Sequence, residues 1–126
     1  MARKHNESKL QRECVRWFDL QYPKLKQLLF AIPNGGARNK IEAGIMKGEG
    51  VRAGVADMFL AEYVDHEKVG HKYQGCHGLF IEFKFGKGKQ TDSQKTFEKS
   101  VKNNWYWYEV VSDFDSFKNL IETYLK

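Results

Sequence analysis

The chain has 126 residues, of which 41% are hydrophobic, and its formal net charge is +5. This length supports one hydrophobic core and excludes a second domain of ordinary size, while the hydrophobic content excludes an intrinsically disordered chain. We therefore expect a single domain over residues 1–126, whose positive charge favours polyanionic partners such as nucleic acid.

The N-terminal residues are polar and no long apolar run follows them, so neither a signal peptide nor a membrane span is expected. We expect an intracellular protein. Two cysteines, Cys14 and Cys76, are expected to be free thiols because the cytosol is reducing and their spacing matches no family pattern.

The spacing of apolar residues predicts elements in the order αβαββαβα, which is typical of a layered α/β fold. A first helix carries Leu10, Cys14 and Trp17 on one stripe and ends before Pro23. In chain order the other elements are a strand over 28–32, a helix over 38–50, strands over 55–63 and 78–85 joined by a hairpin loop, a helix over 91–103, a strand over 105–111 and a final helix from Phe114 to Tyr124.

In the strand that ends at Phe85, successive side chains alternate between the two faces of the predicted sheet. One face is wholly apolar, whereas the other carries Phe80, Glu82 and Lys84. A central strand seldom places two charges on the same face without a role for them. Glu82 and Lys84 are therefore candidate functional residues.

A second carboxylate, Asp57, stands in an otherwise apolar strand after the glycine-rich stretch 48–54. Aspartate is disfavoured in strands, so its presence here also suggests a role. If the two strands are neighbours, Asp57 and Glu82 converge and can bind a hard divalent cation through oxygen, with Phe83 adding a backbone carbonyl. Mg²⁺ or Mn²⁺ suits such a donor set.

A cation bound by these oxygens activates water and neutralises charge on a phosphodiester. Lys84 can orient the nucleophile or stabilise the developing negative charge. The alternative is that Lys84 only neutralises Glu82 as a structural ion pair. The Asp57 strand favours the first interpretation and indicates phosphodiester hydrolysis.

The combination of Asp57 with Glu82-Phe83-Lys84 resembles the PD-(D/E)XK nuclease motif, with Ala56 in place of the motif's proline. More narrowly, the chain resembles the stand-alone virus-type replication-repair nuclease (VRR-NUC) domains of phages and prophages. The resemblance covers nearly the whole chain through Glu7-x-x-x-Gln11, Ile32-Pro33-Asn34-Gly35-Gly36, Gly54-Val55-Ala56-Asp57, Gly78 to Lys84, and Gln94.

The resemblance implies a restriction-endonuclease-like core, in which helices flank a mixed central sheet. It implies metal binding by Asp57, Glu82 and the Phe83 carbonyl, catalysis by Lys84, and supporting roles for Glu7 and Gln94. It also implies a homodimer in the cytoplasm of a bacterium or phage-infected cell, with DNA as substrate, including branched forms such as Holliday junctions. A nucleic-acid-binding module with a degenerate, non-cleaving site is the alternative.

Two of these residues have structural alternatives. Gln94 follows Thr91 at the spacing of a capping box, in which threonine and glutamine satisfy backbone N–H groups at a helix start. Glu7 is also compatible with a solvated residue near a helix N-terminus. The sequence alone does not separate these interpretations.

Two basic, glycine-containing stretches are candidate phosphate contacts, one with Asn34, Arg38 and Lys40 and the other with Lys87 and Lys89. Two further clusters have ordinary alternatives. The residues His66, His71, Cys76 and His77 suggest either a zinc site or a polar hairpin, and the aromatic run 105–108 suggests either base stacking or strand packing. We expect the polar hairpin and the packing.

Overall fold

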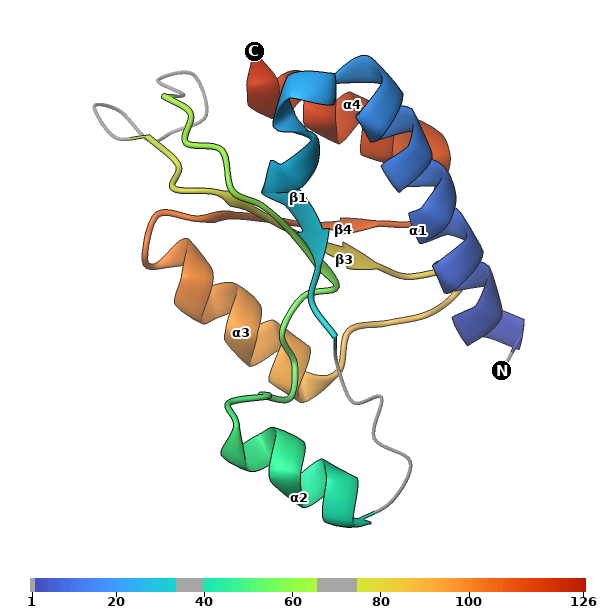
Figure 1. The fold of residues 1–126 in the computed structure, drawn as a ribbon, viewed down its shortest axis with the longest axis vertical. Helices are drawn as coiled ribbons and strands as arrows, with labels where there is room; N and C mark the ends of the chain where they lie inside the picture. The colour runs from blue at the N-terminus through green and yellow to red at the C-terminus, as the bar shows by residue number, and fades with distance from the viewer. Residues whose placement is uncertain (1, 34–39, 66–74) are drawn as a thin grey trace.

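The structure is a computed structural model that describes residues 2–33, 40–65 and 75–126 (Figure 1). Its elements are α1 (Ala2–Gln21), the 3-10 helix η1 (Pro23–Leu28), β1 (Leu29–Ala31), α2 (Lys40–Gly48), β2 (Met58–Leu60), β3 (Leu79–Phe83), α3 (Asp92–Lys102), β4 (Trp107–Val111) and α4 (Phe114–Leu125). The predicted order αβαββαβα is confirmed, and η1 is an addition that the sequence analysis did not predict.

The four strands form one sheet in the order β1-β2-β3-β4. β2 pairs antiparallel with both β1 and β3, whereas β3 pairs parallel with β4. The parallel pair needs a crossover connection, which α3 provides. The mixed central sheet expected from the sequence is therefore confirmed.

The main core lies between one face of the sheet and helices α1 and α4, which pack side by side (Figure 1). The odd-numbered residues of β3 point into this core, where Phe83 stacks on Phe117 of α4 with ring centroids 6.1 Å apart. On α1 the buried stripe is Leu10, Cys14 and Phe18, so Phe18 occupies the place predicted for Trp17. Trp17 lies at the margin of the core.

The opposite face of the sheet is covered by α3 (Figure 1). There Phe97 of α3 contacts Phe80 of β3 edge-on, with ring centroids 5.0 Å apart. Cover on this face is incomplete, because Phe30 of β1 remains 46% exposed. Helix α2 contributes no buried residue and stands away from the sheet (Figure 1).

All four strands are shorter than predicted: β1 and β3 span only Leu29–Ala31 and Leu79–Phe83 of the expected 28–32 and 78–85. The shortening of the other two has a visible cause. β2 spans only Met58–Leu60 of the expected 55–63, because before Met58 the Phe83 N–H of β3 donates to the Asp57 side chain and not to a backbone carbonyl. β4 begins at Trp107 and not at Trp105, because Trp105 has a φ of 67° and turns the chain out of α3. In β2 and β4 the strand is therefore shorter where a side chain or a helix end replaces the hydrogen bonds of the backbone ladder.

Both cysteines, Cys14 and Cys76, are buried and free in the structure. Burial raises the pKa of the Cys14 thiol to about 12, so it remains protonated at neutral pH. No helix within the described ranges is long and apolar enough to cross a membrane.

Candidate active site

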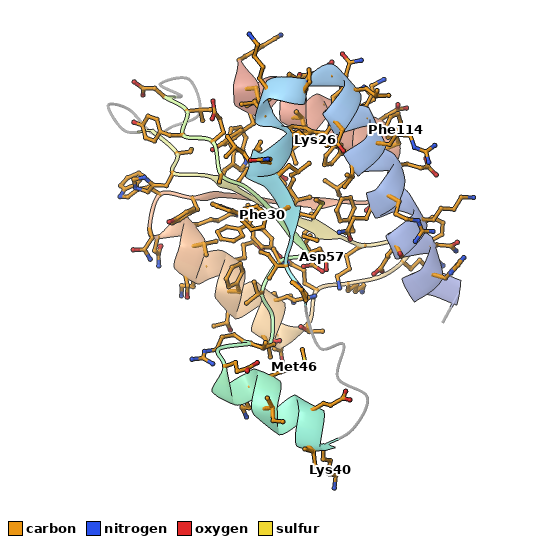
Figure 2. All side chains as sticks on the ribbon, viewed as in Figure 1. Lys26, Phe30, Lys40, Met46, Asp57 and Phe114 are labelled. Atoms are coloured by element: carbon orange, nitrogen blue, oxygen red, sulfur yellow. The ribbon has the colours of Figure 1, made fainter. Side chains whose placement is uncertain are left out.

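The antiparallel register of β2 and β3 brings the two candidate carboxylates together. Met58 pairs with Ile81, so continuing the ladder by one residue sets Asp57 opposite Glu82. Residues opposite each other in an antiparallel pair project to the same face, here the face covered by α3. The convergence expected from the sequence is confirmed, and Figure 2 shows the Asp57 side chain near the middle of the molecule.

Asp57 is fixed by the backbone of the neighbouring strand. The Phe83 N–H donates a hydrogen bond to Asp57 Oδ2 at 2.7 Å. In a strand the carbonyl of a residue points to the same side as its N–H, so the Phe83 carbonyl also faces the β2 side. Asp57, Glu82 and this carbonyl therefore border one space between the diverging strands.

Glu82 is almost completely buried, with 2% of its surface exposed. Its Oε2 accepts a hydrogen bond from Gln94 Nε2 at 2.9 Å and lies 3.4 Å from Lys84 Nζ. Its Oε1 is buried without a hydrogen-bond partner. A buried carboxylate oxygen without a donor is costly, and a bound cation is one way to satisfy it.

The site disfavours a second negative charge. Burial and the negative charge of Asp57 raise the pKa of Glu82 to about 7, although Lys84 opposes this shift. Burial also raises the pKa of Asp57; the Phe83 N–H opposes this shift and the charge of Glu7 adds to it. Paired carboxylates with raised pKa values are typical of functional sites, because stability alone does not favour them.

Gln94 both completes the capping box of α3 and contacts the carboxylate pair. Its backbone N–H donates to Thr91 Oγ1 at 3.2 Å and its Oε1 accepts from the Thr91 N–H at 2.8 Å, which completes the capping box. At the same time its Nε2 donates to Glu82. The cap of α3 therefore orients the carboxamide toward the carboxylate pair.

The substitution Gln94→Glu separates these two tasks. A glutamate keeps an oxygen for the Thr91 N–H but cannot donate to Glu82, and it adds a negative charge. If this is the metal-dependent nuclease site that the resemblance in the sequence implies, cleavage should fall about 10- to 100-fold, as for other groups that orient a metal ligand. The control Thr91→Ala should lower stability by about 1 kcal/mol and leave cleavage nearly unchanged. Nuclease assays and thermal melting test this, and equal effects of both variants on cleavage would contradict it.

Glu7 reaches the same region from α1. Its Oε2 accepts a hydrogen bond from the Phe85 N–H at 3.3 Å, directly after β3, and its charge contributes to the shift at Asp57. The carboxylate is therefore anchored beside the site, and is not a freely solvated helix residue. Its role in the reaction remains a prediction.

One residue that the sequence analysis did not single out individually holds two parts of the site together. Gly54 has a φ of 86°, and a Cβ there would overlap the Ser93 carbonyl in the first turn of α3. Only glycine allows the chain that leads to Asp57 to approach the helix that carries Gln94 so closely. The glycine-rich approach to Asp57 was the signal for this contact.

The basic candidates are less well assembled. Lys87 and Lys89 are exposed in the loop that follows β3, a few residues after Lys84 in the sequence. Lys40 begins α2 and lies at the lower end of the molecule, far from Asp57 in Figure 2. Asn34 and Arg38 lie outside the described residues. Contact of these side chains with phosphate stays a prediction.

The zinc alternative is not supported by the residues that can be placed. Cys76 is buried in the main core, and His77 is exposed, with its ring 5.5 Å from that of Tyr106. His66 and His71 fall outside the described residues. Within the described ranges, no group of three or more His, Cys, Asp or Glu side chains gathers to hold a metal. The Phe83 carbonyl stays the predicted third oxygen donor at the carboxylate pair.

No protein-family model matches the sequence, and no curated protein matches it. Among solved structures, the chain is similar to a protein named VRR_NUC domain protein, with a TM-score of 0.76 and 24% sequence identity. The match covers 94% of this chain and 87% of that chain. The resemblance noted in the sequence is thus confirmed at the level of the fold: the chain has the fold of that VRR-NUC domain protein, a mixed sheet flanked by helices.

Proposed function

We propose that this chain is a nuclease of the VRR-NUC type that hydrolyses DNA phosphodiester bonds with the help of Mg²⁺ or Mn²⁺. The observation that carries the proposal is the pair formed by half-buried Asp57 and buried Glu82 across two antiparallel strands, with Lys84 beside it. The match to a VRR_NUC domain protein over most of both chains supports the same function.

The residues present fit a hard divalent cation. Two carboxylates with raised pKa values, one of them with a buried oxygen that lacks a partner, gain stability from positive charge. We infer that Asp57, Glu82 and the Phe83 carbonyl would hold the ion, because oxygen donors suit Mg²⁺ and Mn²⁺. When bound, it supplies activation of water and charge neutralisation at the phosphate.

The remaining polar groups of the site support this chemistry. Lys84 Nζ lies beside Glu82 with its side chain only 14% exposed, so its charge acts in a poorly solvated space. There it can orient the attacking water or stabilise negative charge on the phosphate oxygens. Gln94 holds Glu82 in position, and Glu7 fixes the backbone at Phe85.

For the substrate we propose DNA, including branched forms such as Holliday junctions. Lys40, Lys87 and Lys89 are exposed and are proposed to contact phosphates, together with Asn34 and Arg38. One chain carries one carboxylate pair, so symmetric cutting of two strands needs two chains related by a two-fold axis. We therefore propose a homodimer in the cytoplasm, which light scattering at micromolar concentration would test.

A cleavage panel tests the proposal. Duplex, flap and four-way-junction DNA are incubated with Mg²⁺ or Mn²⁺ and compared between the wild type and Asp57→Asn. The asparagine keeps an oxygen for the Phe83 N–H but removes the charge, so the fold is preserved while activity falls about 10²- to 10³-fold. Full activity of the variant would refute the site, and binding without cleavage on every substrate would favour a non-cleaving module.

A further inference from the structure

A row of aromatic rings leads away from the carboxylate pair on the α3-covered face of the sheet. Phe80 lies two residues before Glu82 on β3 and points to the same face. Its ring centroid is 4.4 Å from that of Phe59 and 5.4 Å from that of Tyr106. Tyr106 in turn contacts His77 at 5.5 Å. A packed row of aromatic rings thus runs from the site along this face of the sheet.

The row ends at a hollow between the C-terminal half of α3 and the edge of the sheet. The hollow has a volume of about 460 Å³ and is lined by His77, Phe97, Ser100, Val101, Asn104 and Tyr106. Helix α3 runs along this side of the sheet and turns back into β4 beside it (Figure 1). The proposed reaction uses none of these lining residues.

The lining combines flat rings with polar groups at the margins. Phe97, Tyr106 and His77 offer ring faces, while Ser100 and Asn104 bring a hydroxyl and a carboxamide. The Asn104 carboxamide is oriented, because its Nδ2 donates to the Ser100 carbonyl at 2.8 Å. Stacking surfaces together with hydrogen-bonding groups are the means by which proteins bind unpaired bases.

A strained residue lies between two of the lining residues in the chain. Trp105 has a φ of 67°, the left-handed conformation that closes helices and that glycine adopts most easily. The Tyr106 N–H donates to the Val101 carbonyl at 3.1 Å across this turn, and the Trp105 side chain is 40% exposed. Trp105 therefore places a large, partly exposed aromatic residue in the turn between two of the lining residues.

We propose that this hollow binds an unpaired base of the DNA strand whose backbone passes the carboxylate pair. The proposal rests on the nuclease function proposed above and narrows its substrate to DNA with unpaired nucleotides beside the cut. In the parallel register Tyr106 lies level with Gly78, four residues from Glu82 along β3. That separation is about 13 Å, which about four stacked nucleotides span.

A base fits this surface better than a protein partner does. The two most exposed large apolar side chains, which would suit a protein partner, are aliphatic and lie elsewhere: Ile41 on α2 is 76% exposed and Leu20 on α1 is 75% exposed. The hollow is aromatic, shares its sheet face with the carboxylates, and belongs to a chain of net charge +5, which attracts a phosphate backbone.

The test distinguishes binding through the bases from binding through the phosphate backbone. A labelled short thymidine strand and a strand of equal length built from abasic nucleotides are titrated with the protein, with a chelator present to prevent cleavage. We expect the wild type to bind the thymidine strand about 5- to 150-fold more tightly, the range expected for stacked bases. Asn104→Ala and His77→Ala should reduce this ratio several-fold without changing affinity for the abasic strand.

One further variant tests the turn at Trp105, and another is a control that should not change the ratio of affinities. Trp105→Gly removes the indole and relaxes the backbone, so its melting temperature should rise while the preference for bases falls. Leu20→Ala removes another exposed apolar side chain, from α1 on the opposite side of the sheet, and should leave the ratio unchanged. Equal affinity of the wild type for the two strands would refute base binding in the hollow. So would an equal loss of affinity for the thymidine and abasic strands in Asn104→Ala and His77→Ala.

Different experimental results would refute base binding in the hollow and the proposed nuclease function. Cleavage of DNA without any preference for the strand that carries bases would overturn the pocket and leave the nuclease function intact. A clear preference for bases in a protein that cuts no substrate with either metal would overturn the nuclease function and support the pocket.

Discussion

The substitution Glu82→Gln is expected to abolish cleavage and to make the metal-free protein more stable. Loss of the charge removes a proposed metal ligand, which costs several kcal/mol of transition-state stabilisation, or a rate about 10³-fold lower. The same change removes a buried charge whose pKa is raised by burial and by Asp57. The new carboxamide still accepts from Gln94, so we expect a gain in unfolding free energy on the order of 2 kcal/mol at about pH 8.

Chemical denaturation without metal measures the stability, and the cleavage panel measures the activity. Glu98→Gln is the matched control, because Glu98 accepts hydrogen bonds from Lys102 and Gln90, and these interactions lower its pKa. Its loss should destabilise the protein by about 0.5–1 kcal/mol and leave cleavage unchanged. A Glu82→Gln protein that is less stable than the wild type at that pH would show that the carboxylate pair is not strained.

Opposite changes in stability and activity distinguish a functional group from a structural one. If Lys84 merely neutralised Glu82, removal of the carboxylate would leave a buried cation without a partner and would destabilise the fold. The geometry argues otherwise, because Glu82 faces Asp57 as well as Lys84, and one lysine cannot neutralise two carboxylates. Local sequence favours the ion pair, and only the second strand reverses that interpretation.

The centre of the site was predictable from sequence because strand periodicity is a strong signal. Alternation predicted that Glu82 and Lys84 share one face, and the structure confirms that Ile81 and Phe83, which alternate with them, face the core, whereas Phe85 beyond β3 is exposed. The Thr91 capping box was predictable for the same reason, since it depends on residues three apart. Local spacing therefore determined both features.

The convergence of the two carboxylates was predicted only on the condition that their strands are neighbours, because it depends on contacts between distant segments. The pairing of Met58 with Ile81 sets Asp57 opposite Glu82, and a shift by one residue would have separated them. That Gln94 caps α3 and also reaches Glu82 depends on how closely Gly54 lets the helix approach. Neither fact can be read from one segment alone.

For α2, the spacing of apolar residues predicts the helix but not whether its apolar side chains are buried. Its apolar residues have helical spacing, and the predicted helix is present over Lys40–Gly48. Spacing alone would place its apolar side chains in the core, yet Ile41 is 76% exposed and Ile45 is 56% exposed. A hydrophobic pattern indicates which face of a helix is apolar, and tertiary structure decides whether anything covers that face.

The stability of the metal-free protein should fall as pH rises, and a divalent cation should reverse that loss. Burial raises the pKa of Glu82 to about 7 and also raises that of Asp57, so the folded state binds these protons more tightly than the unfolded state. Their contribution is complete below the pKa values of the unfolded chain. It decreases as pH rises through the folded pKa of Glu82, mainly between about pH 4.5 and pH 7.

A cation bound only to the folded state stabilises it by about 2.7 kcal/mol at 100 times its dissociation constant. Near pH 8, which is above the pKa of Glu82, protons compete little with the ion, so Mn²⁺ or Mg²⁺ should raise the melting temperature by roughly 10 °C for a domain of this size. Near about pH 5 protons compete with the ion for the carboxylates, so the rise in melting temperature on adding metal should be only a small fraction of the rise near pH 8. Scanning calorimetry with and without metal measures both values. In Glu82→Gln the shift should disappear, and an unchanged shift in that variant would place the cation elsewhere.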